Sequence, residues 1–405
     1  MNKEGYIMKI LSIDEAKKYV GGKQIVIITG VTGQDGSFMV DYLLKHTNYE
    51  IFGGARRLSV ANHANLDHLV NEPRFHLINF DLTDAHSITQ VISQLNPSYF
   101  INFAAQSFVK SSWDFPTQTW ETNTTAVIHI LEAIRLHCPL CRFYNAGSSE
   151  EFGNVDYSPQ DEKHPLKPRS PYGASKAAVR QIVKVYRESY GLYAIQGWLF
   201  NHEGTRRGEE FVTRKITKGV ARIHAALENG EKFEPLELGN VDAERDWSDA
   251  EDMVDAVWRM LNQEVSWAVN QPIESWQHSV WHKFVVNNIK EYVVSSGETH
   301  SIREFVEKAF KAADIHGEWL GDGLGERFVY LDRKLTTTFP FISDTLRCLV
   351  KINPNNYRPA EVDCLKGNPT QIKSELKWIP VTTFDALVEK MVLNDLNKEP
   401  RRSGV

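Results

Sequence analysis

The sequence predicts an α/β fold in which a doubly wound parallel sheet is followed by a smaller mixed region. Short apolar runs, the first of them at residues 25–28, alternate with helical stretches of ten or more residues up to about residue 235. Continuous apolar strands separated by helices are typical of a parallel sheet covered on both faces. A glycine-rich turn follows the first strand, as it does in many folds of this kind. Beyond residue 235 the alternation becomes irregular, which indicates a second region of mixed structure.

The elements are expected in a regular order. Strands are predicted at residues 25–28, 51–52, 75–80, 99–104 and 142–146, with helices at 39–44 and 126–136 after the first and fourth strands. The irregular part is predicted to hold helices at 248–261, 301–312 and 384–396 and a short strand at 292–294. Residues 1–22 are interpreted as an N-terminal extension with one helix at 13–20, which Gly21 and Gly22 end.

Composition excludes several classes of function. The 405 residues are 42% hydrophobic and 24% charged, with a formal net charge of −6, so neither nucleic acid nor an anionic membrane is expected as the main partner. No apolar run is long enough to span a bilayer, and the first twenty residues lack the apolar centre of a signal peptide. Four cysteines do not form a disulfide framework in a chain of this length, which favours the cytoplasm.

Cys138 and Cys141 form a single CxxC motif. A redox or zinc site would need a second pair nearby, whereas Cys348 and Cys364 are distant and differently spaced. We therefore expect two small core residues at a junction between a helix and a strand, and no metal site.

The turn after the first strand has the pattern GxxGxxG, from Gly30 to Gly36. Glycines allow a tight turn and a close approach of the backbone to a pyrophosphate, which the N-terminus of the following helix stabilises. An ordinary strand-to-helix turn is the alternative, but a position between the first strand and its helix is the one that a dinucleotide-binding motif requires. Residues 81–82 and 103–107, which end the third and fourth strands, are expected to line the adenine and nicotinamide halves of the groove.

The second strand ends in Arg56 and Arg57. A site selective for NAD carries a carboxylate there for the 2′-hydroxyl of the ribose. Two arginines suit a 2′-phosphate instead, because a guanidinium is always charged and can bind phosphate through two donors. A solvated surface pair is the alternative; the position at the strand end favours NADP as the cofactor.

Tyr172 and Lys176 are spaced as i and i+4 after the fifth strand, which places both side chains on one face of a helix. Lys176 can then stabilise a phenolate on Tyr172 and lower its pKa, so that the tyrosine acts as a base near neutral pH. The YxxxK pattern is common by chance. Its position after the fifth strand, counted from the strand that precedes the glycine-rich turn, supports the catalytic interpretation. Ser148, at the end of the fifth strand, is well placed to hydrogen-bond a reacting hydroxyl.

Glu150 lies two residues beyond Ser148 at the same strand end. Dehydrogenation needs only the serine, the tyrosine and the lysine. Elimination of water next to a ketone also needs a group that removes a proton from carbon and protonates the leaving hydroxide, and a carboxyl group can do both. On the spacing alone, a surface carboxylate is an equally good interpretation of Glu150.

Several segments resemble, in the same order, the GDP-mannose 4,6-dehydratase family of the extended short-chain dehydrogenases/reductases. They run from about Val26 to Val392 and include ITGVTGQDGS, the arginines after the second strand, GSSEEFG, RSPYGASK, FNHEGTRRG with FVTRK, RDW and RPAEVDCLKGN. The resemblance implies a Rossmann domain that binds NADP at residues 23–235 and a mainly substrate-binding region at 236–400, from which some strands return to the main sheet. It also implies a homo-oligomer, a tetramer, in which residues 58–66 reach towards the cofactor site of a neighbour.

The resemblance further implies a role for each matching residue. Ser148 takes the position of the active-site threonine or serine of the family, Glu150 that of its acid/base, Tyr172 that of its oxidation base, and Lys176 that of the helper. Positions that contact NADP are Gly30, Thr32, Gly33, Gln34, Asp35, Gly36, Arg56, Arg57, Ser59, Asp81, Leu82, Phe103, Ala104, Ala105, Gln106, Ser107, Tyr172, Lys176, His202 and Arg207. Positions that face the sugar nucleotide are Ser107, Asn201, Lys215, Arg245, Arg358 and Glu361. For Arg245, which stands between two acidic residues, a local surface ion pair is the alternative.

The chain departs from the family at several places. Aromatic residues are usual where Leu166-Lys167 stands, Ser-Pro where Gly204-Thr205 stands, and tyrosine where Gln118 stands. An insertion at residues 265–287 carries a group of aromatic side chains: Trp267, Trp276, Trp281, His278 and His282. It is interpreted as a small local core packed by its own side chains, with a lid or a contact surface as the alternative. Because these departures concern the sugar more than the chemistry, a GDP-heptose or a related hexose is an alternative substrate.

The resemblance implies conversion of GDP-mannose to GDP-4-keto-6-deoxymannose, on the way to deoxysugars such as that of GDP-fucose. Hydride passes from C4 to NADP⁺, water leaves across C5 and C6, and the hydride returns to C6, so the enzyme is a lyase without net redox change. A related epimerase or reductase is the first alternative; an epimerase has no need of Glu150, and a reductase consumes NADPH. A non-catalytic NADP-binding sensor is the second, and it predicts a broken pair at Tyr172 and Lys176.

Overall fold

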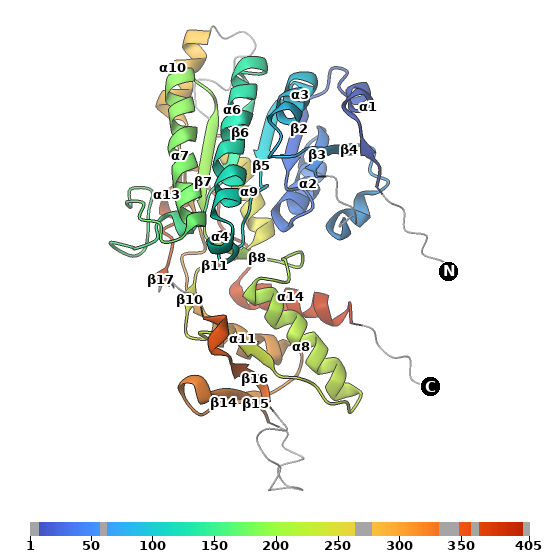
Figure 1. The fold of residues 1–405 in the computed structure, drawn as a ribbon, viewed down its shortest axis with the longest axis vertical. Helices are drawn as coiled ribbons and strands as arrows, with labels where there is room; N and C mark the ends of the chain where they lie inside the picture. The colour runs from blue at the N-terminus through green and yellow to red at the C-terminus, as the bar shows by residue number, and fades with distance from the viewer. Residues whose placement is uncertain (1–7, 57–62, 264–277, 332–347, 358–363, 400–405) are drawn as a thin grey trace.

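A computed structural model describes residues 8–56, 63–263, 278–331, 348–357 and 364–399 of the chain. The molecule is elongated, with an upper lobe around one large sheet and a lower lobe around a smaller sheet (Figure 1). No helix within these ranges combines the length and the apolar character needed to cross a membrane.

The upper lobe holds an eight-stranded parallel sheet with the order β1-β4-β3-β2-β5-β6-β7-β12. Strands β2 and β5 are neighbours near the centre; β3 and β4 are added beside β2, and β6 and β7 beside β5, as in a doubly wound fold. The predicted α/β class is therefore confirmed. The strands are β1 (Ile10–Leu11), β2 (Ile25–Thr29), β3 (Glu50–Ala55), β4 (Phe75–Asn79), β5 (Tyr99–Asn102), β6 (Arg142–Ala146), β7 (Ala194–Leu199) and β12 (Val293–Val294).

Both faces of this sheet are covered, and alternate residues of a strand enter different cores. In β2, Val26 and Ile28 pack into one hydrophobic cluster and Ile25 and Ile27 into the other, because successive side chains of a strand point to opposite sides. The first face is covered by α2 (Gln34–His46), α9 (Ala250–Leu261) and α10 (His278–Asn288). The second face is covered by α1 (Ile13–Ala16), α3 (Ala85–Leu95), α6 (Ala126–His137) and α7 (Pro171–Tyr190). Cys138 and Cys141 are buried in the second core at the α6–β6 junction, as predicted.

The N-terminal segment belongs to the sheet. β1 pairs in parallel with β4 and becomes the edge strand. The helix predicted at 13–20 is α1 followed by a 3-10 turn at Lys17–Tyr19, and Ala16 of α1 is fully buried in the second core.

The described part of the insertion is α10, and it packs into the main core. Trp281 is 2% exposed and lies with Phe284 in the cluster of the first face, where its ring centroid is 6.5 Å from that of Tyr193. The expectation of a separate small core is wrong for this part, because the apolar side chains of α10 pack into the core of the main sheet. Trp267 and Trp276 lie outside the described residues.

The lower lobe is built on a four-stranded mixed sheet with the order β14-β15-β16-β9. These strands are β14 (Gly317–Leu320), β15 (Arg327–Tyr330), β16 (Cys348–Ile352) and β9 (Leu236–Leu238). Its core takes side chains from α8 (Val212–Glu228), α11 (Ile302–Ala312) and α14 (Phe384–Leu396). Helix α8 thus packs with the C-terminal region although it precedes residue 235.

Two small sheets lie at the junction of the lobes. One pairs β8 (Asn201–Glu203) with β11 (Trp247–Asp249), and the other places β10 (Glu244–Arg245) between β13 (His300–Ser301) and β17 (Cys364–Leu365). The short helices α4 (Ser111–Asp114), α5 (Pro116–Trp120) and α13 (Thr370–Glu375) lie in the connections.

Candidate active site

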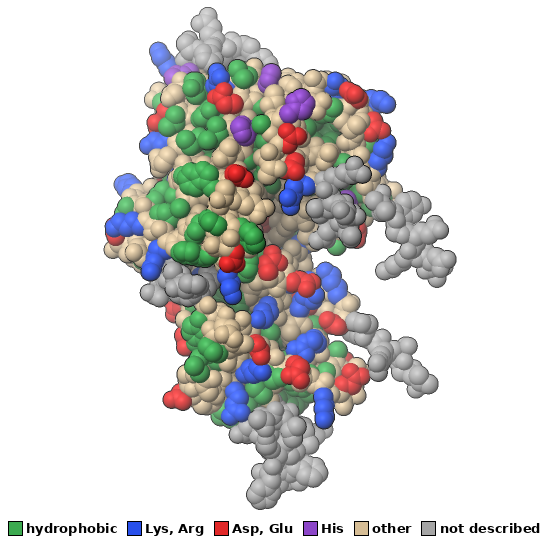
Figure 2. All heavy atoms as spheres, in the orientation of Figure 1, with side chains coloured by type: hydrophobic (Ala, Val, Ile, Leu, Met, Phe, Trp, Pro, Cys, Tyr) green, Lys and Arg blue, Asp and Glu red, His purple; other side chains and the backbone are tan. Residues whose placement is uncertain are grey.

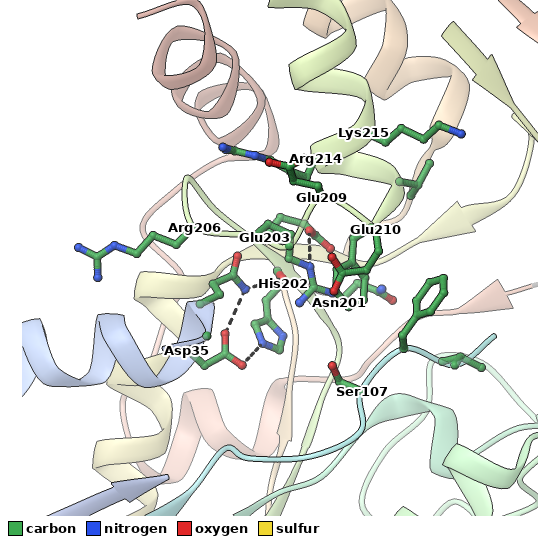
Figure 3. Close-up of a pocket in the computed structure, with 18 of the residues that line it drawn as sticks. Asp35, Ser107, Asn201, His202, Glu203, Arg206, Glu209, Glu210, Arg214 and Lys215 are labelled. Carbon is green, nitrogen blue, oxygen red and sulfur yellow. Dashed lines mark hydrogen bonds and ion pairs between the residues drawn. The ribbon is translucent and has the colours of Figure 1, made fainter. Parts of the chain in front are cut away.

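A cleft of about 1170 Å³ lies between the lobes, at the carboxyl ends of the central strands. The upper lobe contributes Gly30 after β2 and Ser148 after β6, and the lower lobe contributes Lys215 from α8. Ligands of doubly wound folds bind at this edge, where the strand order reverses. Part of the lining is drawn in Figure 3.

The glycine-rich turn has the shape that a pyrophosphate needs. Gly30 has a φ of +69°, a left-handed conformation that other residues rarely adopt. A Cβ atom on Gly36 would stand 2.4 Å from the carbonyl oxygen of Gly30, so the first turn of α2 packs directly on the strand end. Helix α2 begins after Gly33 without a side-chain cap, which leaves backbone N–H groups for an anion. The turn therefore fits a dinucleotide.

Asp35 and His202 join this turn to the β8 strand (Figure 3). The Nε2 atom of His202 is 3.0 Å from Asp35 Oδ2 and its Nδ1 atom is 2.7 Å from the carbonyl oxygen of Phe200. Because both neighbours only accept hydrogen bonds, both ring nitrogens must carry protons. Burial opposes the charges, but the mutual attraction prevails: the pKa of Asp35 is lowered to about 2 and that of His202 is raised.

Tyr172 and Lys176 lie in the first turns of α7, whose start is capped by Ser170. Burial raises the pKa of Tyr172 to about 12, although a hydrogen bond with the Ser148 side chain works in the opposite direction. Burial also lowers the pKa of Lys176 to about 8. The Nζ atom of Lys176 donates to the carbonyl of Ala146 at 2.7 Å and lies 5.9 Å from the ring centre of Tyr172.

The expected lowering of the Tyr172 pKa by Lys176 is therefore wrong for the protein by itself. The lysine is held by a backbone carbonyl rather than by the phenol, and loss of water around the ring outweighs the favourable charges. Additional positive charge in the cleft is needed to form the phenolate near neutral pH.

The adjacent Glu150 and Glu151 have different surroundings. Glu150 lines the cleft with Ser148 and Tyr172. Glu151 is fully buried on the other side of the turn, where it forms an ion pair with Arg180. Of these two carboxylates, Glu150 is thus the one that can reach a ligand in the cleft.

Cations and carboxylates both line the part of the cleft that the lower lobe faces; Glu209, Glu210 and Asp395 are among the carboxylates. Lys110, Lys215 and Arg245 line this part together with Asn201. Burial lowers the pKa of Lys215; the carboxylate of Glu237 opposes this change, and Lys110 acts in the same direction as burial. Arg245 is 7% exposed, so its side chain is buried rather than solvated at the surface. Three cations in a cleft suit a diphosphate.

The structure brings most of the predicted site residues together. Those that line the cleft are Gly30, Thr32, Gly33, Gln34, Asp35, Gly36, Phe103, Ala105, Ser107, Ser148, Glu150, Tyr172, Lys176, Asn201, His202, Arg207, Lys215 and Arg245. Arg57, Ser59, Arg358 and Glu361 lie outside the described residues.

Five predicted cofactor residues stand apart from the cleft lining: Arg56, Asp81, Leu82, Ala104 and Gln106. Arg56 is exposed at the end of β3. Asp81 accepts a hydrogen bond from the backbone N–H of Thr83, and Leu82 and Ala104 pack in the second core. The backbone of Gln106 is held by Asn123.

Sequence reasoning missed several lining residues, among them Lys110, Asn65, Arg206, Glu209 and Tyr357. Asn65 lies in the 3-10 helix Ala64–Leu69 and donates to the carbonyl of Thr32 at 2.9 Å, so it supports the glycine-rich turn. Arg206 stands within the FNHEGTRRG segment, whereas the other four stand outside the motifs and are brought to the cleft by the fold.

Comparison with known proteins identifies the family of the chain. The GDP-mannose 4,6 dehydratase family matches residues 27–274 and 273–391. A GDP-mannose 4,6 dehydratase of Drosophila melanogaster is 40% identical over 92% of this chain and 86% of its own length, and one of Vibrio cholerae is 38% identical over 93% and 94%. A solved dTDP-glucose 4,6-dehydratase of Streptomyces venezuelae shares the fold, with a TM-score of 0.69, 19% identity and coverage of 92% of this chain and 96% of that one. The chain belongs to the GDP-mannose 4,6-dehydratase family.

Proposed function

We propose that this protein is a GDP-mannose 4,6-dehydratase, a hydro-lyase that converts GDP-mannose to GDP-4-keto-6-deoxymannose. The observation that carries the proposal is the place of Glu150, which lines the cleft beside Ser148, Tyr172 and Lys176. An oxidation needs only the last three, whereas removal of water needs a further acid/base at the same carbon skeleton. The intact tyrosine–lysine pair disfavours a non-catalytic sensor.

NADP is the proposed cofactor. The glycine-rich turn and the start of α2 suit its pyrophosphate, and Arg56 and Arg57 suit its 2′-phosphate. When bound, the oxidised nicotinamide takes up a hydride and gives it back, so that it is regenerated in each turnover. A positive charge placed near Tyr172 also lowers the pKa of the phenol, which supplies the condition that the protein alone does not meet.

The residues of the chain then have separate tasks. Tyr172 accepts the proton of the O4 hydroxyl, which Ser148 orients. Once C4 is a ketone, the proton on C5 becomes acidic; Glu150 removes it and protonates the hydroxide that leaves C6. When the hydride is given back to C6, C5 takes up one proton, which balances the proton that Tyr172 accepted from O4 and resets the group. Lys215 and Arg245, lining the lower half of the cleft, bind the diphosphate and so hold the sugar against the catalytic group.

The proposal is tested by incubating the purified protein with GDP-mannose, before and after NADP⁺ is supplied, and following product mass and NADPH absorbance. Loss of one water without net change in NADPH is the expected result. A product of unchanged mass indicates an epimerase, and stoichiometric consumption of added NADPH indicates a reductase. A GDP-heptose tested in parallel shows whether the sugar assignment holds.

A homotetramer in the cytoplasm completes the proposal. The tetramer is supported by membership of the family. The cytoplasm is supported by the buried free thiols of Cys138, Cys141 and Cys348, which persist in a reducing compartment.

A further inference from the structure

Four polar side chains form a row through the middle of the parallel sheet, close to the strand ends that carry the cleft. Thr29, Asn102, Asn145 and Gln196 are register partners on the neighbouring strands β2, β5, β6 and β7. Each is at most 2% exposed. Buried polar groups are costly unless each is hydrogen-bonded, so a continuous row of them in an otherwise apolar layer calls for a function.

Hydrogen bonds run along this row in one direction. The hydroxyl of Thr29 donates to Asn102 Oδ1, Asn102 Nδ2 donates to Asn145 Oδ1 at 2.7 Å, and Asn145 Nδ2 donates to Gln196 Oε1 at 2.7 Å. Gln196 Nε2 then donates to Glu151 Oε1 at 3.0 Å and to the carbonyl of Lys176 at 2.9 Å. The Glu151 carboxylate, ion-paired with Arg180, and the carbonyl of Lys176 both only accept, so together they fix the orientation of every amide before them. Burial raises the pKa of Glu151, and Arg180 and the hydrogen bonds from Ser148 and Gln196 oppose that rise.

Glu151 also holds the catalytic segments. Its Oε1 atom accepts from the backbone N–H of Ser148 at 2.9 Å, and its carboxylate forms an ion pair with Arg180 of α7. Arg180 in turn pairs with Glu291 at 2.9 Å, which also binds Arg187 at 3.0 Å. One buried carboxylate thus connects the turn that carries Ser148 and Glu150 to the helix that carries Tyr172 and Lys176.

We propose that Glu151 is a positioning residue for the dehydratase reaction, in which its buried charge fixes the Ser148–Glu150 turn against α7 and sets the protonation of Tyr172 and Lys176. The reaction it serves is the proposed function, on which this inference rests. Glu151 does not line the cleft, so it acts through the residues it holds.

The charges around Glu151 support this electrostatic role. Burial raises the pKa of Tyr172, and the carboxylates of Glu150 and Glu151 act in the same direction against Ser148 and Arg207. Burial and Arg180 lower the pKa of Lys176, and Glu151 opposes them. The other titratable or charged groups near the pair are Tyr144, Glu291, Arg187, Glu150 and Arg207. Removal of Glu151 alone leaves the opposing charge of Arg180 in place, and removal of Arg180 alone leaves that of Glu151.

The test compares Glu151→Gln, which leaves Arg180 unbalanced, with Arg180→Gln, which leaves Glu151 unbalanced. We expect the acidic limb of the pH profile of kcat to move to lower pH in the first variant and to higher pH in the second, each by roughly one unit, the scale on which a nearby charge moves a pKa. The KM for GDP-mannose should change less than kcat. A purely structural role would lower activity in both variants without opposite shifts, and that result overturns the proposal.

Two controls keep the outcome clear. Glu132→Gln removes one partner of a half-exposed ion pair with Arg135 on α6 and should leave the pH profile in place. The double variant at Glu151 and Arg180 carries neither charge and should fold where a single variant does not. The acidic limb of the pH profile of the double variant should return close to that of the parent. Its kcat should stay reduced at least about tenfold, because the Ser148 N–H keeps a weaker acceptor. A kcat equal to that of the parent overturns the positioning role.

A second readout needs no substrate. The titration of Tyr172 is followed by ultraviolet difference absorbance, with the same variant carrying Tyr172→Phe as the reference. Opposite shifts in the two single variants support the role of Glu151 even if GDP-mannose proves not to be the substrate. Turnover of GDP-mannose by the parent with no shift in either titration or profile would leave the proposed function intact and refute this inference.

Discussion

At the scale of single residues, neighbours of the same type take different roles according to what covers them. From the spacing alone Glu150 could be an acid/base or a surface carboxylate, and no sequence pattern indicated a role for Glu151. The structure places Glu150 in the cleft and buries Glu151 against Arg180. A sequence pattern shows which side chains are available at a strand end, but which of them faces the ligand depends on packing from distant segments.

Replacement of Glu150 by glutamine separates elimination from oxidation. Glutamine keeps the size of the side chain but cannot take up the C5 proton, so dehydrated product should fall by roughly a hundredfold or more. Oxidation at C4 depends on Tyr172, Lys176 and Ser148 and should persist, leaving bound NADPH that is visible by its near-ultraviolet absorbance. Tyr172→Phe should abolish both signals. Release of product by Glu150→Gln at close to the parent rate would remove Glu150 from the mechanism.

Cofactor selectivity is expected to depend on the arginines after β3. Arg56 is exposed there and Arg57 lies outside the described residues. Arg56→Ala and Arg57→Ala should each weaken NADP(H) binding far more than NAD(H) binding, because a charge-assisted bond to the 2′-phosphate is lost. Titration calorimetry with both cofactors measures the difference, and Arg222→Ala on the exposed side of α8 is the matched control. An equal loss for both cofactors argues against NADP.

At the scale of elements, long periodic segments were predictable and short ones were not. The helix at 384–396 and the strand at 142–146 coincide with α14 and β6, because their apolar periodicity is continuous. The two-residue strands β1 and β10 carry no periodic signal. β1 pairs with β4, and β10 pairs with both β13 and β17, so pairing with distant segments defines these strands.

The N-terminal extension should therefore stabilise the upper lobe. Ala16 is fully buried in the second core, with Leu11 and Ile13 partly buried against it. Removal of residues 1–22 should lower the free energy of unfolding by on the order of 3 kcal/mol, the value for a few half-buried apolar side chains, and should expose the edge of β4 to self-association. Urea unfolding measures the first effect and light scattering the second. Unchanged stability would show that the segment is dispensable.

The pair of Asp35 and His202 should make the junction of α2 and β8 sensitive to pH. The pKa of Asp35 is depressed, so its contribution is complete above about pH 4 and is lost as the pH falls towards 2; that of His202 is raised, so its contribution is lost as the pH rises above its folded value. The stabilising window thus spans about pH 4 to 6.5. Asp35→Asn should lower the free energy of unfolding more at pH 6 than at pH 9, by roughly 2 kcal/mol at the lower pH; urea unfolding at the two pH values measures the difference. An equal loss at both values would contradict the charged pair.

At the scale of the whole molecule, the fold class and the cofactor half of the cleft could be predicted, because the glycine-rich turn, Tyr172 and Lys176 belong to local motifs with fixed places in a doubly wound sheet. The lower half could not be assembled from spacing, since Lys110, Lys215 and Arg245 come from separate segments. The boundary at residue 235 stays a prediction, and so do the roles of residues outside the described ranges.

The assembly is the last prediction. Large apolar side chains are exposed on the helices of the second face, among them Leu136 on α6, 61% exposed, and Val185 on α7, 49% exposed. Figure 2 shows hydrophobic side chains over this part of the upper lobe, where α6 and α7 lie in Figure 1. Contiguous exposed apolar surface marks sites of association, so the parent should sediment as a tetramer at micromolar concentration.

Introduction of a negative charge on this surface tests the interface. Leu136→Glu and Val185→Glu should each shift the sedimenting species towards smaller assemblies, because a carboxylate buried in an interface without a partner is costly. Val381→Glu places the same charge at a position that is 85% exposed and away from these helices, and it should leave the assembly unchanged. A parent that sediments only as a monomer would refute the oligomer. Dissociation by Val381→Glu alone would place the interface near the start of α9 instead, where Asp252 accepts a hydrogen bond from the backbone of Val381.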